Sequence, residues 1–158
     1  MNILVLCTGN SARSILLEST LNQNGKGRLR AFSAGSRPSG RVHPQSLALL
    51  RAHGHDTSAA RSKSWDEFAD PDAPSMDAVI TVCGSAAEET CPFWPGAPVR
   101  AHWGVEDPVA APEADQPRAF REAYEILNRR AAALLALPLE GIDPARLKSE
   151  LDRIGKIA

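Results

Sequence analysis

A cysteine and an arginine separated by five residues form the strongest chemical signal in the sequence. Cys7 and Arg13 bound the run CTGNSAR, which follows a short apolar stretch and precedes a helix-like segment. A loop between a strand and a helix N-terminus directs several backbone N–H groups at one point, where an oxyanion binds. We expect Arg13 to hold two oxygens of that anion and Gly9 to supply the dihedral angles of a tight loop. The same positive potential should lower the pKa of Cys7 and make it a thiolate nucleophile.

The whole run after Cys7 is the predicted oxyanion site, with Ser14 donating to the thiolate and Asn10 fixing the shape of the loop. Its residues are Thr8, Gly9, Asn10, Ser11, Ala12, Arg13 and Ser14. The alternative is a buried cysteine at a strand end and an unrelated surface arginine. The strand before the loop, the helix after it and the glycine within it favour the site.

A candidate general acid lies in the second half of the chain. Splitting an oxyanion ester requires a proton for the departing oxygen, from a carboxyl on a loop over the nucleophile. Asp107 precedes Pro108 in the run HWGVEDP, which suits a loop-borne acid. A plain turn is the alternative for an Asp-Pro pair.

Two further thiols, Cys83 and Cys91, complete the cysteines of the chain. An odd, low number of cysteines argues against a secreted disulfide framework and for a reducing cytoplasm. Seven residues separate the two, with no histidine nearby, which is not a zinc spacing. Cys83 follows a predicted strand and should therefore lie at the same sheet edge as Cys7. The helix-compatible segment 84–89 could unwind to bring Cys91 to Cys83, although two incidental thiols are the alternative.

Apolar runs that alternate with helical patterns must position these groups. The sequence predicts βαβ units and an α/β fold, a three-layer sandwich in which helices flank a four-stranded parallel sheet. The expected strands are Asn2–Leu6, Arg30–Ala34, Ala78–Val82 and Pro98–His102. The expected helices are Ser14–Gln23, Pro44–Ala52, Gln116–Leu135 and Asp143–Ile154. Ligands of such sheets bind at the carboxyl ends of the strands, where Cys7 and Cys83 lie.

Length and charge restrict the possible partners. A chain of 158 residues suits one domain, which we place at residues 1–138, with residues 139–158 as a helical extension docked on it. The net charge of −1 gives no basis for nucleic-acid binding by bulk charge. No apolar run reaches the roughly 20 residues of a membrane span, and the N-terminus does not resemble a secretory signal. We expect a cytoplasmic monomer that binds neither nucleic acid nor membrane.

The run LVLCTGNSARS resembles the phosphate-binding loop of the low-molecular-weight protein tyrosine phosphatase fold. Together with HWGVEDP it resembles, more narrowly, the thioredoxin-coupled arsenate reductases built on that fold. The resemblance covers about residues 2–136, nearly the whole chain. It implies that Cys7, Arg13 and Asp107 are catalytic.

The resemblance also implies a relay of the three thiols. Cys7 attacks arsenate, Cys83 attacks Cys7 as arsenite leaves, and Cys91 then attacks Cys83. An external dithiol, thioredoxin in this family, reduces the last disulfide, so no metal or organic cofactor is needed. Glutaredoxin with glutathione is an alternative reductant that the sequence leaves open.

One departure separates the chain from phosphatases of the fold. They usually continue the Asp-Pro pair with tyrosines that line the entrance for an aryl substrate, whereas Val109, Ala110 and Ala111 stand here. The only tyrosine, Tyr124, falls on the apolar stripe of a long helix. A phosphatase acting on phosphomonoesters remains the first alternative, and a non-enzymatic oxyanion-binding regulator the second.

Members of the family can hold potassium beside the loop. Glu18 and Ser33 match two ligand positions, with Asn10 as a third, but Lys63 stands where a carboxylate is common. We therefore predict that the Lys63 ammonium replaces the cation and that activity does not depend on potassium. A solvated Lys63 is the alternative.

Overall fold

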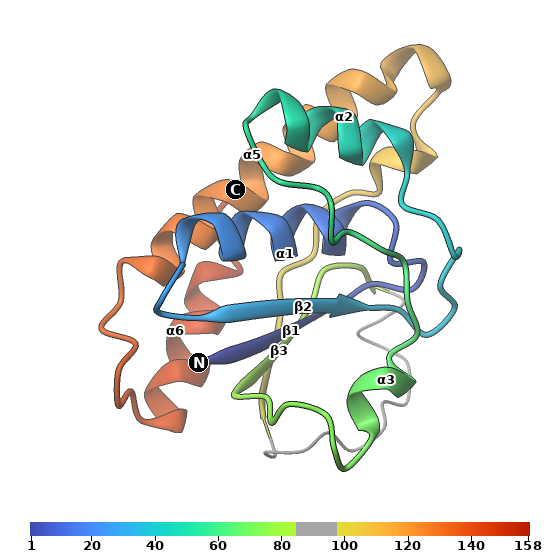
Figure 1. Ribbon diagram of the computed structural model, residues 1–158. Coiled ribbons are helices and arrows are strands. Elements are labelled where there is room, and N and C mark those ends of the chain that lie inside the picture. Colours follow the sequence, from blue (N-terminus) through green and yellow to red (C-terminus); the bar gives the residue numbers. More distant parts are fainter. Residues whose placement is uncertain (85–97) are drawn as a thin grey trace.

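Four parallel strands form the centre of the computed structural model, which describes residues 1–84 and 98–158 (Figure 1). They are β1 (Asn2–Leu6), β2 (Arg30–Ala34), β3 (Ala78–Thr81) and β4 (Val99–His102). Their order is β2-β1-β3-β4, and all three pairings are parallel. Leu6 pairs with Ala34 on one side and Thr81 on the other, so the carboxyl ends of these strands are level. The predicted four-stranded parallel sheet is confirmed.

Helices cover the sheet on both faces. They are α1 (Arg13–Asn24), α2 (Pro44–Ala52), α3 (Asp66–Ala69), α5 (Gln116–Leu135) and α6 (Pro144–Ile154), with short 3-10 turns at Pro108–Ala110 and Glu113–Asp115. Figure 1 shows α1, α2 and α5 on one side of the strands and α3 on the other. The three-layer α/β arrangement is thus as predicted. No helix in the described parts of the chain is long and apolar enough to cross a membrane.

The core forms where the apolar stripe of each element meets the sheet. In β1, Ile3 to Leu6 are almost fully buried, as expected for a central parallel strand. On α5, the predicted stripe is buried, and its members are Phe120, Tyr124, Leu127, Ala131 and Leu134. The short helix α3 escaped prediction because a single buried side chain, Phe68, anchors its four residues.

Side chains of α1 cover the exposed edge of the sheet at β2. The Asn22 amide both donates to the Ala31 carbonyl, at 2.9 Å, and accepts from the Ala31 N–H, at 2.8 Å. These bonds occupy backbone groups that an edge strand would otherwise present to another chain. The opposite edge strand, β4, packs against α6.

Candidate functional site

The site lies at the carboxyl edge of the sheet, in a hollow of about 480 Å³. It is lined by Cys7, Thr8, Gly9, Asn10, Ser11, Ala12, Arg13, Cys83, Gly84, Asp107 and Val109. Segments far apart in the sequence therefore meet here, because parallel strands end at one edge. Of the predicted catalytic residues, Cys7, Arg13, Cys83 and Asp107 are brought together, whereas Cys91 lies outside the described residues. The segment 84–89 also lies outside them, apart from Gly84.

A neighbouring segment turns the carbonyls of the Cys7–Ala12 loop outward. Three of its backbone N–H groups bind those carbonyls, each at 3.0 Å: Arg37 on Thr8, Ser39 on Gly9 and His43 on Ser11. The side chains of Ser46 and Ser62 donate to the Ser11 and Gly9 carbonyls. With the carbonyls held away, the loop amides are available for an anion. No side chain of the described residues caps the N-terminus of α1 at Ala12, so its first amides face the same anion site.

Asn10 fixes the shape of the loop, as predicted. It has a φ of 46°, and its buried amide donates to Ser14 at 2.8 Å and Ser33 at 3.0 Å. Its side-chain oxygen accepts from the Lys63 backbone N–H at 3.0 Å. Asparagine tolerates this left-handed conformation better than most residues. The expectation that Gly9 supplies the unusual dihedral is wrong, because Asn10 does so. A donation from Ser14 to the thiolate stays a prediction.

Gly35, directly after β2, is the functional residue that sequence reasoning missed. A Cβ at this position would lie 2.3 Å from the Thr8 carbonyl oxygen and 2.6 Å from that of Cys7. The backbone of the Cys7–Ala12 loop therefore rests directly on Gly35. A glycine at the end of a predicted strand was the only available signal, since the contact joins segments distant in sequence.

Arg13 links the Cys7–Ala12 loop to the candidate acid. Its Nη1 donates to the Val105 carbonyl at 3.0 Å, and its Nη2 lies 3.7 Å from Asp107 Oδ2. The Nε is buried and has no hydrogen-bond partner among the described residues. Asp107 Oδ1 accepts from the Val109 N–H at 3.0 Å, which orients the carboxyl at the start of a 3-10 turn. An oxyanion in the hollow could supply the missing acceptor for Arg13 Nε.

Cys83 lies against the predicted nucleophile. Both thiols are buried, and both line the same hollow. Thr8 also donates its backbone N–H to the Cys83 sulfur at 3.4 Å. The hydrogen bond from Cys83, and then burial, raise the pKa of Cys7, while Arg13 opposes the shift. The expectation of a lowered pKa is wrong for this arrangement, because the second thiol outweighs the positive potential of the loop.

Lys63 fills the position where a cation was considered. Its ammonium lies 3.8 Å from the Glu18 carboxylate, 3.4 Å from Ser33 Oγ and 3.1 Å from the Arg61 carbonyl. Burial lowers the pKa of Lys63 and raises that of Glu18, and each charge partly offsets the shift of the other. The alternative of a solvated lysine is wrong, since only 7% of its side chain is exposed.

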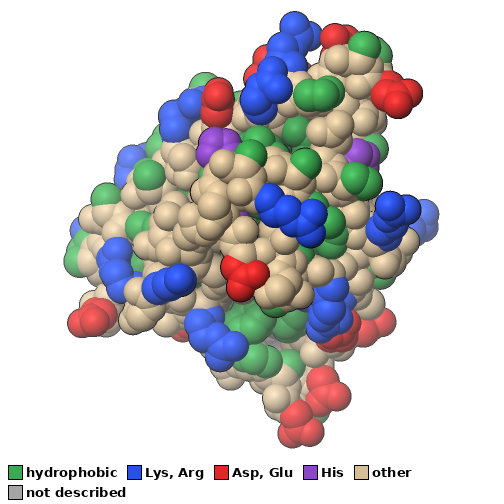
Figure 2. Space-filling model, turned by 45° about the horizontal axis from the view of Figure 1, so that its top comes forward, with side chains coloured by type: hydrophobic (Ala, Val, Ile, Leu, Met, Phe, Trp, Pro, Cys, Tyr) green, Lys and Arg blue, Asp and Glu red, His purple; other side chains and the backbone are tan. Residues whose placement is uncertain are grey.

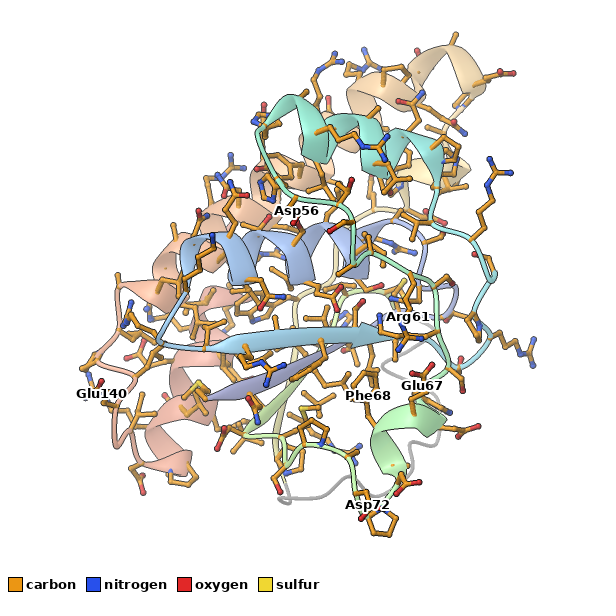
Figure 3. The ribbon with its side chains drawn as sticks, in the orientation of Figure 1. Asp56, Arg61, Glu67, Phe68, Asp72 and Glu140 are labelled. Carbon is orange, nitrogen blue, oxygen red and sulfur yellow. The ribbon has the colours of Figure 1, made fainter. Side chains whose placement is uncertain are left out.

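A second ion pair adjoins this one. Arg61 and Glu67 form two hydrogen bonds, at 2.9 and 2.6 Å. Figure 3 shows the two labelled side chains meeting beside α3. On the face in Figure 2, both basic and acidic side chains are scattered over the surface.

Tyr124 does not line the hollow. Its hydroxyl lies 3.0 Å from Nε2 of the buried His55, within the interface of α5 with its neighbours. Val109 lines the hollow instead of an aromatic side chain. The sequence-based expectation of no tyrosine wall is thus met among the described residues.

Comparison with known proteins shows the family to which the chain belongs. The family of low molecular weight phosphotyrosine protein phosphatases matches residues 2–152. The chain belongs to this family. Among curated relatives, the arsenate reductase of Bacillus licheniformis is 37% identical over 110 residues, 69% of this chain and 75% of its own length. That of Bacillus subtilis is 35% identical over 131 residues, 80% of this chain and 90% of its own.

Solved structures agree with this placement. An arsenate reductase in the phosphate binding state shares 28% identity at a TM-score of 0.69, covering 85% of this chain and 96% of its own. A thioredoxin-dependent arsenate reductase of Corynebacterium glutamicum, at 24% identity and a TM-score of 0.63, covers 85% of this chain and 60% of its own. The second likeness shows the fold alone. The resemblance to arsenate reductases of this phosphatase fold, seen first in the loop sequence, is confirmed.

Proposed function

We propose that the protein reduces arsenate to arsenite. The observation that carries this proposal is the second thiol: Cys83 lines the same hollow as Cys7, and its sulfur accepts the backbone N–H of Thr8, the residue after Cys7, at 3.4 Å. A phosphatase of this fold needs only the nucleophile, the arginine and the acid. The arsenate reductases among the relatives support the same conclusion.

The first step forms a bond between sulfur and arsenic. The loop amides and Arg13 hold arsenate, and the Cys7 sulfur attacks the arsenic atom. One oxygen leaves as water after Asp107 gives it a proton. Because the pKa of Cys7 is raised beside Cys83, an oxygen of the bound anion takes the thiol proton as the sulfur attacks.

The second step transfers two electrons. Cys83 attacks the Cys7 sulfur, a disulfide forms, and the electron pair of the S–As bond passes to arsenic, which leaves as arsenite. We propose that Cys91 then attacks Cys83 and releases Cys7. An external dithiol, for which we propose thioredoxin, reduces the Cys83–Cys91 disulfide. This chemistry requires neither a metal nor an organic cofactor, and a relay of thiols suits a reducing cytoplasm.

Hydrolysis of phosphomonoesters is the second candidate function. It is favoured by the pairing of Arg13 with Asp107 over Cys7, which suffices for a phosphatase. The two candidates differ in their need for the other thiols, since only reduction requires them.

Turnover assays separate the candidates. Arsenate-dependent consumption of reducing equivalents is measured with thioredoxin and its reductase, and separately with glutaredoxin and glutathione. The wild type is compared with Cys83→Ser and Cys91→Ser. We expect thioredoxin-supported turnover in the wild type and none above background in either variant. Turnover of phosphomonoesters alone, unaffected by the substitutions, would establish the phosphatase instead.

A further inference from the structure

A buried arginine outside the proposed chemistry ties the C-terminal end of the chain to a strand end. Arg130, on α5, is only 6% exposed. Its Nη1 donates to the carbonyls of Trp103 at 2.8 Å and Gly104 at 3.2 Å, and its Nε donates to that of Ile157 at 2.9 Å. No carboxylate in the described parts of the chain pairs with it. A buried cation that binds only neutral carbonyls is costly, so its geometry must serve a purpose.

The carbonyls that Arg130 holds begin the loop that carries the candidate acid. Val105 follows Gly104 directly, donates its N–H to the Val82 carbonyl at 3.2 Å, and accepts from Arg13 at 3.0 Å. Asp107 comes two residues later and faces Arg13. A shift of the backbone at Gly104 would therefore move the carboxyl relative to the hollow.

Helix α6 holds the same strand end from its other side. Trp103 is fully buried and donates its indole N–H to the Leu151 carbonyl at 2.8 Å. A Cβ at Gly155 would lie 2.7 Å from the His102 carbonyl oxygen and 2.9 Å from Trp103 Cδ1. The last turn of α6 therefore rests directly on this backbone. In Figure 1 the C-terminus lies beside α5, consistent with the bond from Arg130 to Ile157.

We infer that Arg130 and α6 position the loop that carries Asp107, so that residues 139–158 contribute to catalysis from a distance. The inference rests on the proposed function, in which Asp107 protonates the leaving oxygen. Arg130 is a positioning residue, because it touches neither the hollow nor Asp107. Small displacements of a catalytic group can lower rates by a factor on the order of 100.

The test combines Arg130→Met with Asp107→Asn in a double-mutant cycle. Arg129→Met is the matched control, since Arg129 is the adjacent residue on α5 and, among the described residues, binds only the Ala158 carbonyl of the same terminus, at 2.9 Å. We expect kcat to fall roughly 100-fold in Arg130→Met and to stay within about twofold of the wild type in Arg129→Met. In the Asp107→Asn background, Arg130→Met should cause no further loss. Losses that multiply in the double variant, or equal rates in the two arginine variants, would overturn the inference.

Two further variants keep the inference testable if Arg130→Met does not fold. Arg130→Lys retains the positive charge and a single donor group, and it should recover part of the rate. Gly155→Ala pushes α6 away from Trp103 and should lower kcat only when Asp107 is present. Thermal unfolding identifies folded variants.

The cycle is run with arsenate and with an aryl phosphomonoester, because Asp107 would serve both reactions. If only the ester is turned over, arsenate reduction fails while the cycle still tests Arg130. If both substrates are turned over and no Arg130 or Gly155 variant acts through Asp107, the positioning role fails alone.

Discussion

Removal of the Lys63 ammonium should destabilise the protein by leaving a buried carboxylate without its partner. In Lys63→Met, Glu18 keeps only 16% of its side chain exposed and loses a cation 3.8 Å away. At an effective dielectric constant of about 20, that attraction amounts to roughly 4 kcal/mol. Loss of one partner of a buried pair typically costs about 3–5 kcal/mol. We therefore expect a loss of about 4 kcal/mol in the free energy of unfolding at pH 8.

The pH dependence of this loss has a definite sign. Burial already raises the folded-state pKa of Glu18 above its ordinary value of 4.5, and loss of Lys63 raises it further. The folded variant then binds a proton at a higher pH than the unfolded chain does. Its stability consequently increases as the pH falls through the folded-state pKa, and the deficit relative to the wild type shrinks towards pH 4.5.

Urea unfolding at pH 8 and pH 5.5 measures both effects. The double variant Glu18→Gln with Lys63→Met should recover most of the loss, because neither residue of the pair then carries a charge. Arg118→Met, which breaks exposed pairs with Asp115 and Glu122, is the control and should cost about 0.5 kcal/mol or less. A deficit below about 1 kcal/mol at pH 8, or one that does not change with pH, would refute the reasoning.

Three further predictions concern the hollow and its support. Gly35→Ala should lower arsenate turnover roughly 100-fold, because the added Cβ would collide with the backbone of Cys7 and Thr8. An unchanged steady-state rate would contradict the close contact. In Val109→Tyr, the ratio of kcat/KM for an aryl phosphate to kcat/KM for an alkyl phosphate should rise about 2- to 10-fold, since a ring at the entrance can stack on the aryl group. An unchanged ratio would mean that position 109 does not form the entrance. Wild-type turnover should be equal in potassium chloride and sodium chloride of the same ionic strength, because Lys63 supplies the positive charge. Marked activation by potassium would contradict this role of Lys63.

Much of the fold could be predicted because its signals are local. The apolar runs of β1 and β3 and the stripe of α5 place each element within a residue of its observed bounds. Parallel strands then dictate that Cys7 and Cys83 meet at one edge. The loop could be predicted equally well, because Cys7, Gly9 and Arg13 lie within one continuous segment.

The errors arose where one segment depends on another that is distant in sequence. The raised pKa of Cys7 comes from Cys83, which lies 76 residues further along the chain. The need for Gly35 comes from the carbonyls of Cys7 and Thr8. The left-handed residue of the loop is Asn10, and two of the three partners of its amide, Ser33 and Lys63, lie far from it in sequence. The neighbouring residues in the sequence do not indicate such contacts.

A single-turnover reaction tests the central claim most directly. Reduced protein is mixed with excess arsenate in the absence of any reductant, and arsenite and remaining thiols are counted. We predict one arsenite per chain in the wild type and in Cys91→Ser, with two thiols lost in each. Cys83→Ser should form no arsenite, because it lacks the thiol that attacks the Cys7 sulfur and releases arsenic from it. Arsenite formation by Cys83→Ser at the wild-type rate would contradict the account.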